Sequence, residues 1–422
     1  MRCLKPTIFA AMIHFEKFYL DNGLEVIVHP DPTTSIVCLN TLFKVGSRNE
    51  NENKTGFAHL FEHLMFGGSK NIKNFDEPLQ AVGGDNNAFT STDITNYYTK
   101  VPSNNVETAF WLESDRMLSL SFEPKVLEIQ RSVVIEEFKQ RYLNQPYGDV
   151  WHLIRELAYK QHSYRWPTIG KSIDHIEDAT MEDVKLFFKS YYHPSNAVLV
   201  IAGDISLDKA KSLAEKWYGP IPAGEVPSQA VPSEPAQKKQ RALTVEKEIP
   251  NDMFYKTYHM QGRAHSSYLA TDLLSDVLGR GKSSILHQKL VKEKQVLSHV
   301  NTYVLGSMDP GLFVIQGQYS PNATTAQVEK ELKETLDEFE NKDIEKELDK
   351  VKNLATSSLV FGEAELLNRA MNLAYASYVD TTDSVNDELY KIQKVSSLDV
   401  KTAMRQVVKP TNENTLYYLK EN

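Results

Sequence analysis

The chain has 422 residues, of which 41% are hydrophobic and 24% are charged. One ordinary hydrophobic core does not accommodate that length, so we expect two or more globular domains. The net charge of −9 argues against nucleic acid as the main partner, because binding to phosphates requires clustered lysine and arginine.

The N-terminal segment and the cysteines bear on the compartment. Arg2 and Lys5 precede a short apolar run at residues 6–13, which is short for a signal peptide and has no clear cleavage site after it. We interpret this run as a lead-in to the first strand and keep a degenerate export signal to the periplasm as the alternative. The two cysteines, Cys3 and Cys38, allow one disulfide at most and favour a reducing compartment, the cytoplasm. No stretch approaches 18 apolar residues, so we expect no membrane span.

Strand patterns come first in the chain and helix patterns follow. Residues 24–30 and 35–46 are rich in β-branched and apolar residues, which predicts two strands. Helical periodicity predicts helices at residues 104–119, 123–145, 206–217 and 324–340. Paired strands followed by helices indicate an α+β layer in each half of the chain.

A proline-rich segment at residues 219–240 divides the chain into two halves of similar length. Its five prolines predict a semi-rigid exposed connector. The sequence YYHPSNAVLVIAGDI from Tyr191 resembles VVKPTNENTLYYLKE from Val407, and each stands at the end of its half. We therefore predict two homologous domains, residues 1–218 and 241–422, that arose by duplication.

The segment TGFAHLFEHLMFGGS, from Thr55 to Ser69, predicts a metal site on a helix. At 100° per residue, His59, Glu62 and His63 fall within an arc of about 100°, and the large apolar residues lie on the opposite side. Histidines at positions i and i+4 can both bind one Zn²⁺ at about 2.0–2.1 Å, with Glu62 beside it as catalytic base. The arrangement is the inverted form, HxxEH, of the HExxH metallopeptidase motif.

A catalytic zinc site usually has three protein ligands, so another residue is needed. The helical segment EIQRSVVIEEFKQR, from Glu128 to Arg141, offers Glu136 and Glu137. Periodicity alone does not choose between them, because either could be an ordinary solvated carboxylate.

These motifs resemble the insulinase/pitrilysin family of zinc peptidases, which includes the mitochondrial processing peptidases. HLFEH matches the family's zinc motif, and VVIEE matches its downstream acidic motif, which implies Glu137 as the third ligand. Where the family usually has a supporting acidic residue, this chain has Gln130. The resemblance implies two α/β-sandwich domains of the processing-peptidase type, joined by the proline-rich linker, with the zinc motif in the first.

GGDNNAFTSTDITNYY, from Gly83 to Tyr98, resembles the family's strand beside the active site. In the family, the backbone of the substrate adds to the edge of that strand. The resemblance therefore implies that Asn87, Ala88 and Phe89 line a bound peptide, although a plain edge strand is an equal alternative for each of them.

The chain departs from the family in its second half. The family uses an arginine and a tyrosine, in the pattern LRxxxxLxY, to bind substrate and polarise the scissile carbonyl. The matching segment, LVKEKQVLSHV from Leu290, has Val291 and Ser298 at those positions. We therefore expect a zinc endopeptidase subunit, with one Zn²⁺, whose homologous two-domain partner supplies the Arg/Tyr pair. The alternative is a non-catalytic structural or processing-complex subunit, but such chains typically lose the zinc motif, which is intact here.

Overall fold

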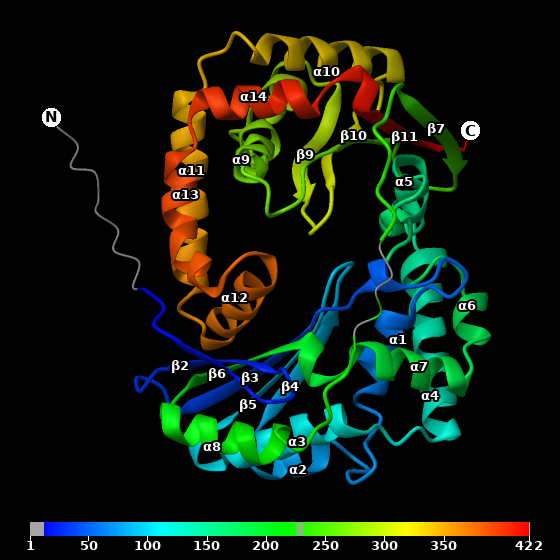
Figure 1. Ribbon diagram of the computed structural model, residues 1–422. Coiled ribbons are helices and arrows are strands. Elements are labelled where there is room, and N and C mark those ends of the chain that lie inside the picture. Colours follow the sequence, from blue (N-terminus) through cyan, green and yellow to red (C-terminus); the bar gives the residue numbers. More distant parts are fainter. Residues whose placement is uncertain (1–11, 226, 228–230, 422) are drawn as a thin grey trace, which may run out of the picture.

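Two mixed β-sheets, one in each half of the chain, form the framework of the protein (Figure 1). The computed structural model describes residues 12–421 except 226 and 228–230. In the described part, the spatial order of the first sheet is β1-β2-β6-β3-β5-β4 and that of the second is β7-β11-β8-β10-β9. The strands are β1 Glu16–Tyr19, β2 Glu25–Pro30, β3 Ile36–Phe43, β4 Asp85–Thr90, β5 Thr95–Pro102, β6 Ala197–Gly203, β7 Arg241–Lys247, β8 Met253–His259, β9 Leu297–Leu305, β10 Leu312–Tyr319 and β11 Glu413–Lys420.

The two sheets share the same topology over five strands. β2 pairs with β6 in parallel and β7 pairs with β11 in parallel, while the other neighbouring strands are antiparallel. If β2 is matched to β7, the five strands from β2 to β4 correspond one to one to those of the second sheet in the same spatial order, and β1 is an additional edge strand of the first sheet. Before the matching strands β6 and β11, an asparagine side chain donates to a backbone carbonyl five residues earlier, from Asn196 to Tyr191 and from Asn412 to Val407, both at 2.9 Å. The predicted α+β class with two related domains is confirmed.

Helices cover both sheets, and the four predicted helical segments are confirmed as α3, α4 with the π-helical turn after it, α8 and α10. Several helices begin at a capping box, in which a threonine or serine side chain and the third helical residue satisfy each other's backbone groups; Thr180 with Asp183 at α7 is an example. The helices are α1 Phe57–Leu64, α2 Asp76–Ala81, α3 Val106–Leu118, α4 Pro124–Phe138, α5 Val150–Ala158, α6 Asp174–Glu177, α7 Met181–Tyr191, α8 Leu207–Tyr218, α9 Tyr268–Gly279, α10 Thr325–Phe339, α11 Glu345–Gly362, α12 Leu366–Val379, α13 Glu388–Lys394 and α14 Ser397–Val407, with π-helical turns at Lys139–Leu143 and His287–Glu293.

One helix from each half of the chain packs on the sheet of the other half (Figure 1). Helix α5 of the first half packs on the second sheet, where Ile154 shares a buried cluster with Leu416. Helix α12 of the second half packs on β3 and β6, where Leu373 shares a buried cluster with Val200. Every residue of β6 is consequently buried, which explains its uninterrupted apolar sequence. All strands of the first sheet precede residue 219 and all strands of the second follow residue 240, which supports the proposed division at the linker.

The described residues bear only partly on the predictions about the N-terminus and the cysteines. Residues 1–11, which include Cys3 and most of the apolar run at 6–13, lie outside the described part. Cys38 is buried and forms no disulfide with any described residue. Within residues 12–421, apart from the gaps in the linker, none of the helices combines the length and the apolar character that a membrane crossing requires.

Candidate metal centre

Helix α1 presents its two faces as the sequence pattern predicts. Its apolar residues are buried in the first core, with Phe61 and Leu60 fully inaccessible, while His59, Glu62 and His63 are only partly buried. The rings of the two histidines lie edge to face with their centroids 4.9 Å apart. The apolar side of α1 therefore packs in the core, and its other side carries the imidazoles of His59 and His63 and the carboxylate of Glu62.

Helix α4 brings Glu137 to these histidines. The Oε2 atom of Glu137 lies 3.6 Å from Nε2 of His59 and 3.6 Å from Nε2 of His63. Glu136 instead is exposed and pairs with Lys139 at 2.8 Å. Of the two glutamates that the sequence left open, the structure places Glu137 against the histidines.

The donor set fits a zinc ion. Two atoms that each lie about 2.1 Å from zinc in tetrahedral geometry are separated by about 3.4 Å, close to the distances between Glu137 and the histidines. Among the described residues, His59, His63 and Glu137 are the one group of three metal-binding side chains whose ligand atoms all lie within 4.8 Å of one another. Burial lowers the pKa of His59 to about 4, which keeps that imidazole in the neutral form that a metal requires.

Arg141, one turn beyond Glu137, holds the other oxygen of its carboxylate. The guanidinium Nη1 lies 2.8 Å from Oε1 of Glu137, so Oε2 is the oxygen that faces the histidines. The nearby imidazoles of His63 and His59, together with the charge of Arg141, hold the pKa of Glu137 below its ordinary value despite burial. Gln130 lies on the same helix, and its side chain makes no hydrogen bond to any residue of the described chain.

The side chain of Glu62, on α1, faces the end of strand β4. The hydroxyl of Thr90 donates a hydrogen bond of 2.6 Å to Oε2 of Glu62. Burial raises the pKa of the Glu62 carboxyl, and the bond from Thr90 opposes that rise. A carboxylate with a raised pKa is better suited to accept a proton near neutral pH than an exposed one.

Strand β4, which carries Thr90, is one of the two edge strands of the first sheet. Asn87 and Phe89 are exposed and Ala88 is half-buried against the first core, as expected for alternating residues on an edge strand. The strand pairs with β5 on one side only, so its other side can accept an added strand.

Glu50 fixes the start of α1, a role that no sequence pattern indicated. One carboxylate oxygen accepts the backbone N–H of Gly56 at 2.9 Å, and the other accepts that of Ala58 at 2.8 Å. The indole of Trp166 donates to the same carboxylate at 3.0 Å. Burial raises the pKa of Glu50 to about 8. An acidic residue directly before a predicted helix start is a known capping signal. Glu50 lies several residues before the start of α1, so this signal did not indicate it.

Replacing Glu50 by alanine is expected to lower the free energy of unfolding by about 3 kcal/mol, because two buried N–H groups at the start of α1 lose their acceptor. Thermal or denaturant unfolding measures this loss. Glu52→Ala is the matched control, since Glu52 is exposed and pairs with Arg165 at the surface. That change is expected to cost less than about 1 kcal/mol, and equal losses for the two variants would show that Glu50 is not a cap.

The second half of the chain contacts the turn that follows Thr90. Asp93, in that turn, accepts the backbone N–H of Met308 at 3.0 Å and the hydroxyl of Tyr164. Arg48 bridges to Asp309 at 3.0 Å. The loop between β9 and β10 therefore helps to fix the turn beside the metal site, a long-range contact that no sequence pattern indicated.

The positions where the resemblance implied an Arg/Tyr pair hold no such groups. Val291 packs against the second core, and the hydroxyl of Ser298 lies 3.3 Å from the backbone carbonyls of Gln318 and Tyr319. The described residues of the second half contain no group of three clustered metal-binding side chains.

Comparisons with known proteins agree with this geometry. A family model described as "Insulinase (Peptidase family M16)" matches residues 25–171, and one described as "Peptidase M16 inactive domain" matches residues 178–354. The zinc protease PqqE of Helicobacter pylori is 33% identical over 365 residues, which is 82% of each chain. The beta subunit of the mitochondrial-processing peptidase of Saccharomyces cerevisiae is 29% identical over 211 residues, 49% of this chain and 45% of the relative.

A solved structure supports the same assignment. The crystal structure of a protease from Helicobacter pylori superposes with a TM-score of 0.89 at 29% identity, and the match covers 96% of this chain and 100% of that one. The fold is thus of the type that the resemblance implied, and relatives over most of the chain are named zinc proteases. On these matches the chain belongs to the insulinase family, peptidase family M16.

Proposed function

We propose that the chain is the zinc-bearing subunit of an endopeptidase that hydrolyses peptides or unfolded segments. In this proposal His59, His63 and Glu137 hold one Zn²⁺, and Glu62 is the catalytic base. The observation that carries it is the convergence of three ligand atoms within 4.8 Å, beside a carboxylate and an open strand edge. The zinc protease names of the relatives support the same class of reaction.

Different residues of the chain have different roles in the proposed hydrolysis. A zinc ion bound here would act as a Lewis acid, lowering the pKa of the attacking water toward about 7. Thr90 holds Oε2 of Glu62, so we assign proton transfer to Oε1. Glu62 accepts the proton of the water through this oxygen and then returns it to the leaving amine. Arg141 keeps Glu137 ionised and oriented toward the histidines.

Strand β4 supplies the means of binding substrate. An extended peptide that pairs with its free edge would run past Thr90 and therefore past Glu62. Because the contacts come from the backbone, this mode accepts varied sequences in extended or unfolded segments. We propose Asn87, Ala88 and Phe89 as the residues that line the peptide.

The proposed partner follows from what the second half lacks. A valine and a serine, the latter bonded to backbone carbonyls, cannot donate to a substrate carbonyl as an arginine and a tyrosine do. We therefore propose that a homologous two-domain chain carrying Arg and Tyr completes the site. For the compartment we propose the cytoplasm, on the grounds of the low cysteine content, and cell fractionation tests this.

Metal analysis and peptide hydrolysis on one sample of the purified chain test the proposal. We expect one zinc per chain and little hydrolysis without the partner. Strong hydrolysis by the chain alone would contradict the partner and leave the zinc site intact. Absence of zinc after purification in zinc-containing buffer would contradict the peptidase assignment and favour a non-catalytic subunit.

A further inference from the structure

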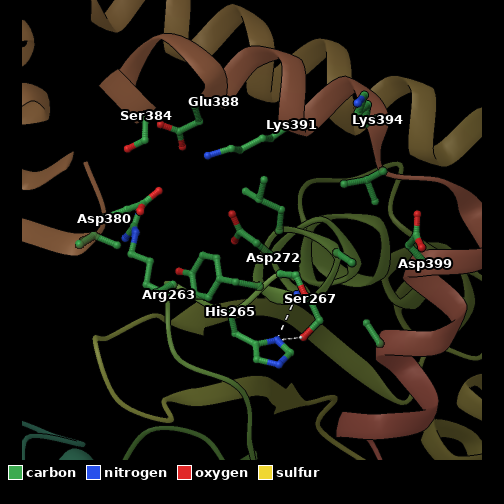
Figure 2. A pocket seen from close by; sticks show the side chains of 18 of the residues that line it. Arg263, His265, Ser267, Asp272, Asp380, Ser384, Glu388, Lys391, Lys394 and Asp399 are labelled. Carbon is green, nitrogen blue, oxygen red and sulfur yellow. Dashed lines mark hydrogen bonds between the residues drawn. The ribbon is translucent and has the colours of Figure 1, made fainter. Parts of the chain in front are cut away.

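A pocket of about 830 Å³ lies in the second half of the chain, away from the residues of the metal site. Helices α9, α12, α13 and α14 and the loop before α9 surround it (Figure 2). Its volume is within the range of about 300–1,000 Å³ that is typical of sites for small ligands. The proposed peptidase function gives this pocket no role.

Charged side chains of both signs face this pocket without pairing. Arg263, Asp272 and Glu388 line it from the loop, from α9 and from α13 (Figure 2). Among the described residues, none of these three forms an ion pair within 4.0 Å. On the same helix α9, by contrast, Asp276 pairs with Arg280 at 2.9 Å. The oppositely charged side chains that line the pocket are therefore kept apart, whereas Asp276 and Arg280 pair with each other.

Two aromatic rings hold the guanidinium of Arg263 in place. The guanidinium of Arg263 lies 5.4 Å from the ring centre of Tyr268 and 4.9 Å from that of Tyr375. Stacking of this kind fixes the plane of the guanidinium and leaves its N–H groups to bind an anion. A fixed guanidinium fork suits a carboxylate, to which it can donate two parallel hydrogen bonds.

The carboxylates of the pocket have no paired cation: Lys391 and Lys394 also line the pocket from α13, but no lysine or arginine nitrogen of the described residues lies within 4.0 Å of a carboxylate oxygen of Asp272 or Glu388. The carboxylate of Asp272 makes no hydrogen bond to any described residue. Burial, with the charges of Asp276 and Glu388 and against that of Arg263, raises the pKa of this carboxyl to about 6. A partly buried carboxylate without a partner is costly, and a ligand ammonium would remove that cost. Glu388 contributes a second carboxylate from α13.

We propose that this pocket binds a small zwitterionic amino compound, a free amino acid or a dipeptide. Its carboxylate binds Arg263, and its ammonium binds Asp272 and Glu388. Because the pocket contains no residue of the metal site, this binding is expected whether or not the chain hydrolyses peptides.

Calorimetric titration with L-alanyl-L-alanine tests the proposal. The titration uses the Glu62→Gln chain, so that the ligand is not cleaved. The N-acetylated dipeptide lacks the ammonium and the C-terminal amide lacks the carboxylate. We expect each blocked form to bind at least about ten-fold more weakly than the zwitterion, because each loses one charge-assisted contact.

Variants locate the binding. Asp272→Asn is expected to remove the preference over the N-acetylated form, and Arg263→Gln the preference over the amide. Asp337→Asn and Arg405→Gln remove the same charges from exposed ion pairs outside the pocket, and they are expected to leave affinity unchanged. Circular dichroism checks that each variant is folded. The proposal is overturned if the dipeptide does not bind, if the blocked forms bind equally, or if folded Asp272→Asn and Arg263→Gln chains bind like the parent.

Discussion

Replacing Glu62 by glutamine is expected to reduce peptide hydrolysis about 10³-fold while one zinc per chain remains bound. Proton transfer by a positioned base contributes about 10²–10⁴ to the rate. Glutamine has the shape of glutamate and can still accept the hydrogen bond from Thr90, but it cannot accept a proton. The measurement is the initial rate of peptide cleavage in the active preparation, the chain alone or with its co-purified partner, with zinc determined on the same sample.

Two further variants test whether the loss of rate is specific to the carboxylate of Glu62. Glu136→Gln makes the same chemical change at an exposed carboxylate on α4 and is expected to leave the rate unchanged. Thr90→Val removes only the hydrogen bond to Oε2 of Glu62, and we expect a loss of about ten-fold from it. If Glu62→Gln retained more than a tenth of the parent rate, Glu62 would not be the base.

Local sequence patterns were sufficient to predict the helix that carries the motif. The spacing of His59, Glu62 and His63 places them on one face because helical geometry is fixed, and no other part of the chain is needed for that conclusion. The fold class followed from periodicity and from the two similar segments at Tyr191 and Val407. These conclusions depend on neighbours in sequence, which is why they could be reached without a structure.

The remainder of the site depends on contacts between distant segments. Glu136 and Glu137 differ by one position on one helix, and only the packing of α4 against α1 decides which faces the histidines. Asp93 accepts a backbone N–H from Met308, far along the chain. Glu50 accepts N–H groups from Gly56 and Ala58, which are further from it than the usual capping pattern spans. The exchange of α5 and α12 between the halves leaves no local signature, because an amphipathic helix does not encode which sheet it covers.

Replacing Glu137 by alanine is expected to weaken zinc binding by at least about 100-fold, because loss of a supporting contact alone costs 10–100-fold. Removing this carboxylate leaves two imidazoles to hold the ion. The same variant is expected to lose most of the rise in unfolding temperature that zinc gives the parent chain, since the stabilisation by a bound ion increases with the logarithm of its affinity. Competition with a chromogenic chelator measures the affinity, and calorimetry with and without zinc measures the unfolding temperature.

Glu136→Ala is the matched control for Glu137→Ala, since it deletes the neighbouring carboxylate on the solvent side of the same helix. Its partner Lys139 is also exposed enough to be resolvated, so zinc affinity and stability are expected to change little. The reverse pattern, with zinc lost in Glu136→Ala and kept in Glu137→Ala, would contradict the packing of α4 against α1. Loss of zinc in Glu137→Ala alone would mean that the ion joins two helices distant in sequence, so that chelation should loosen the contact between α1 and α4.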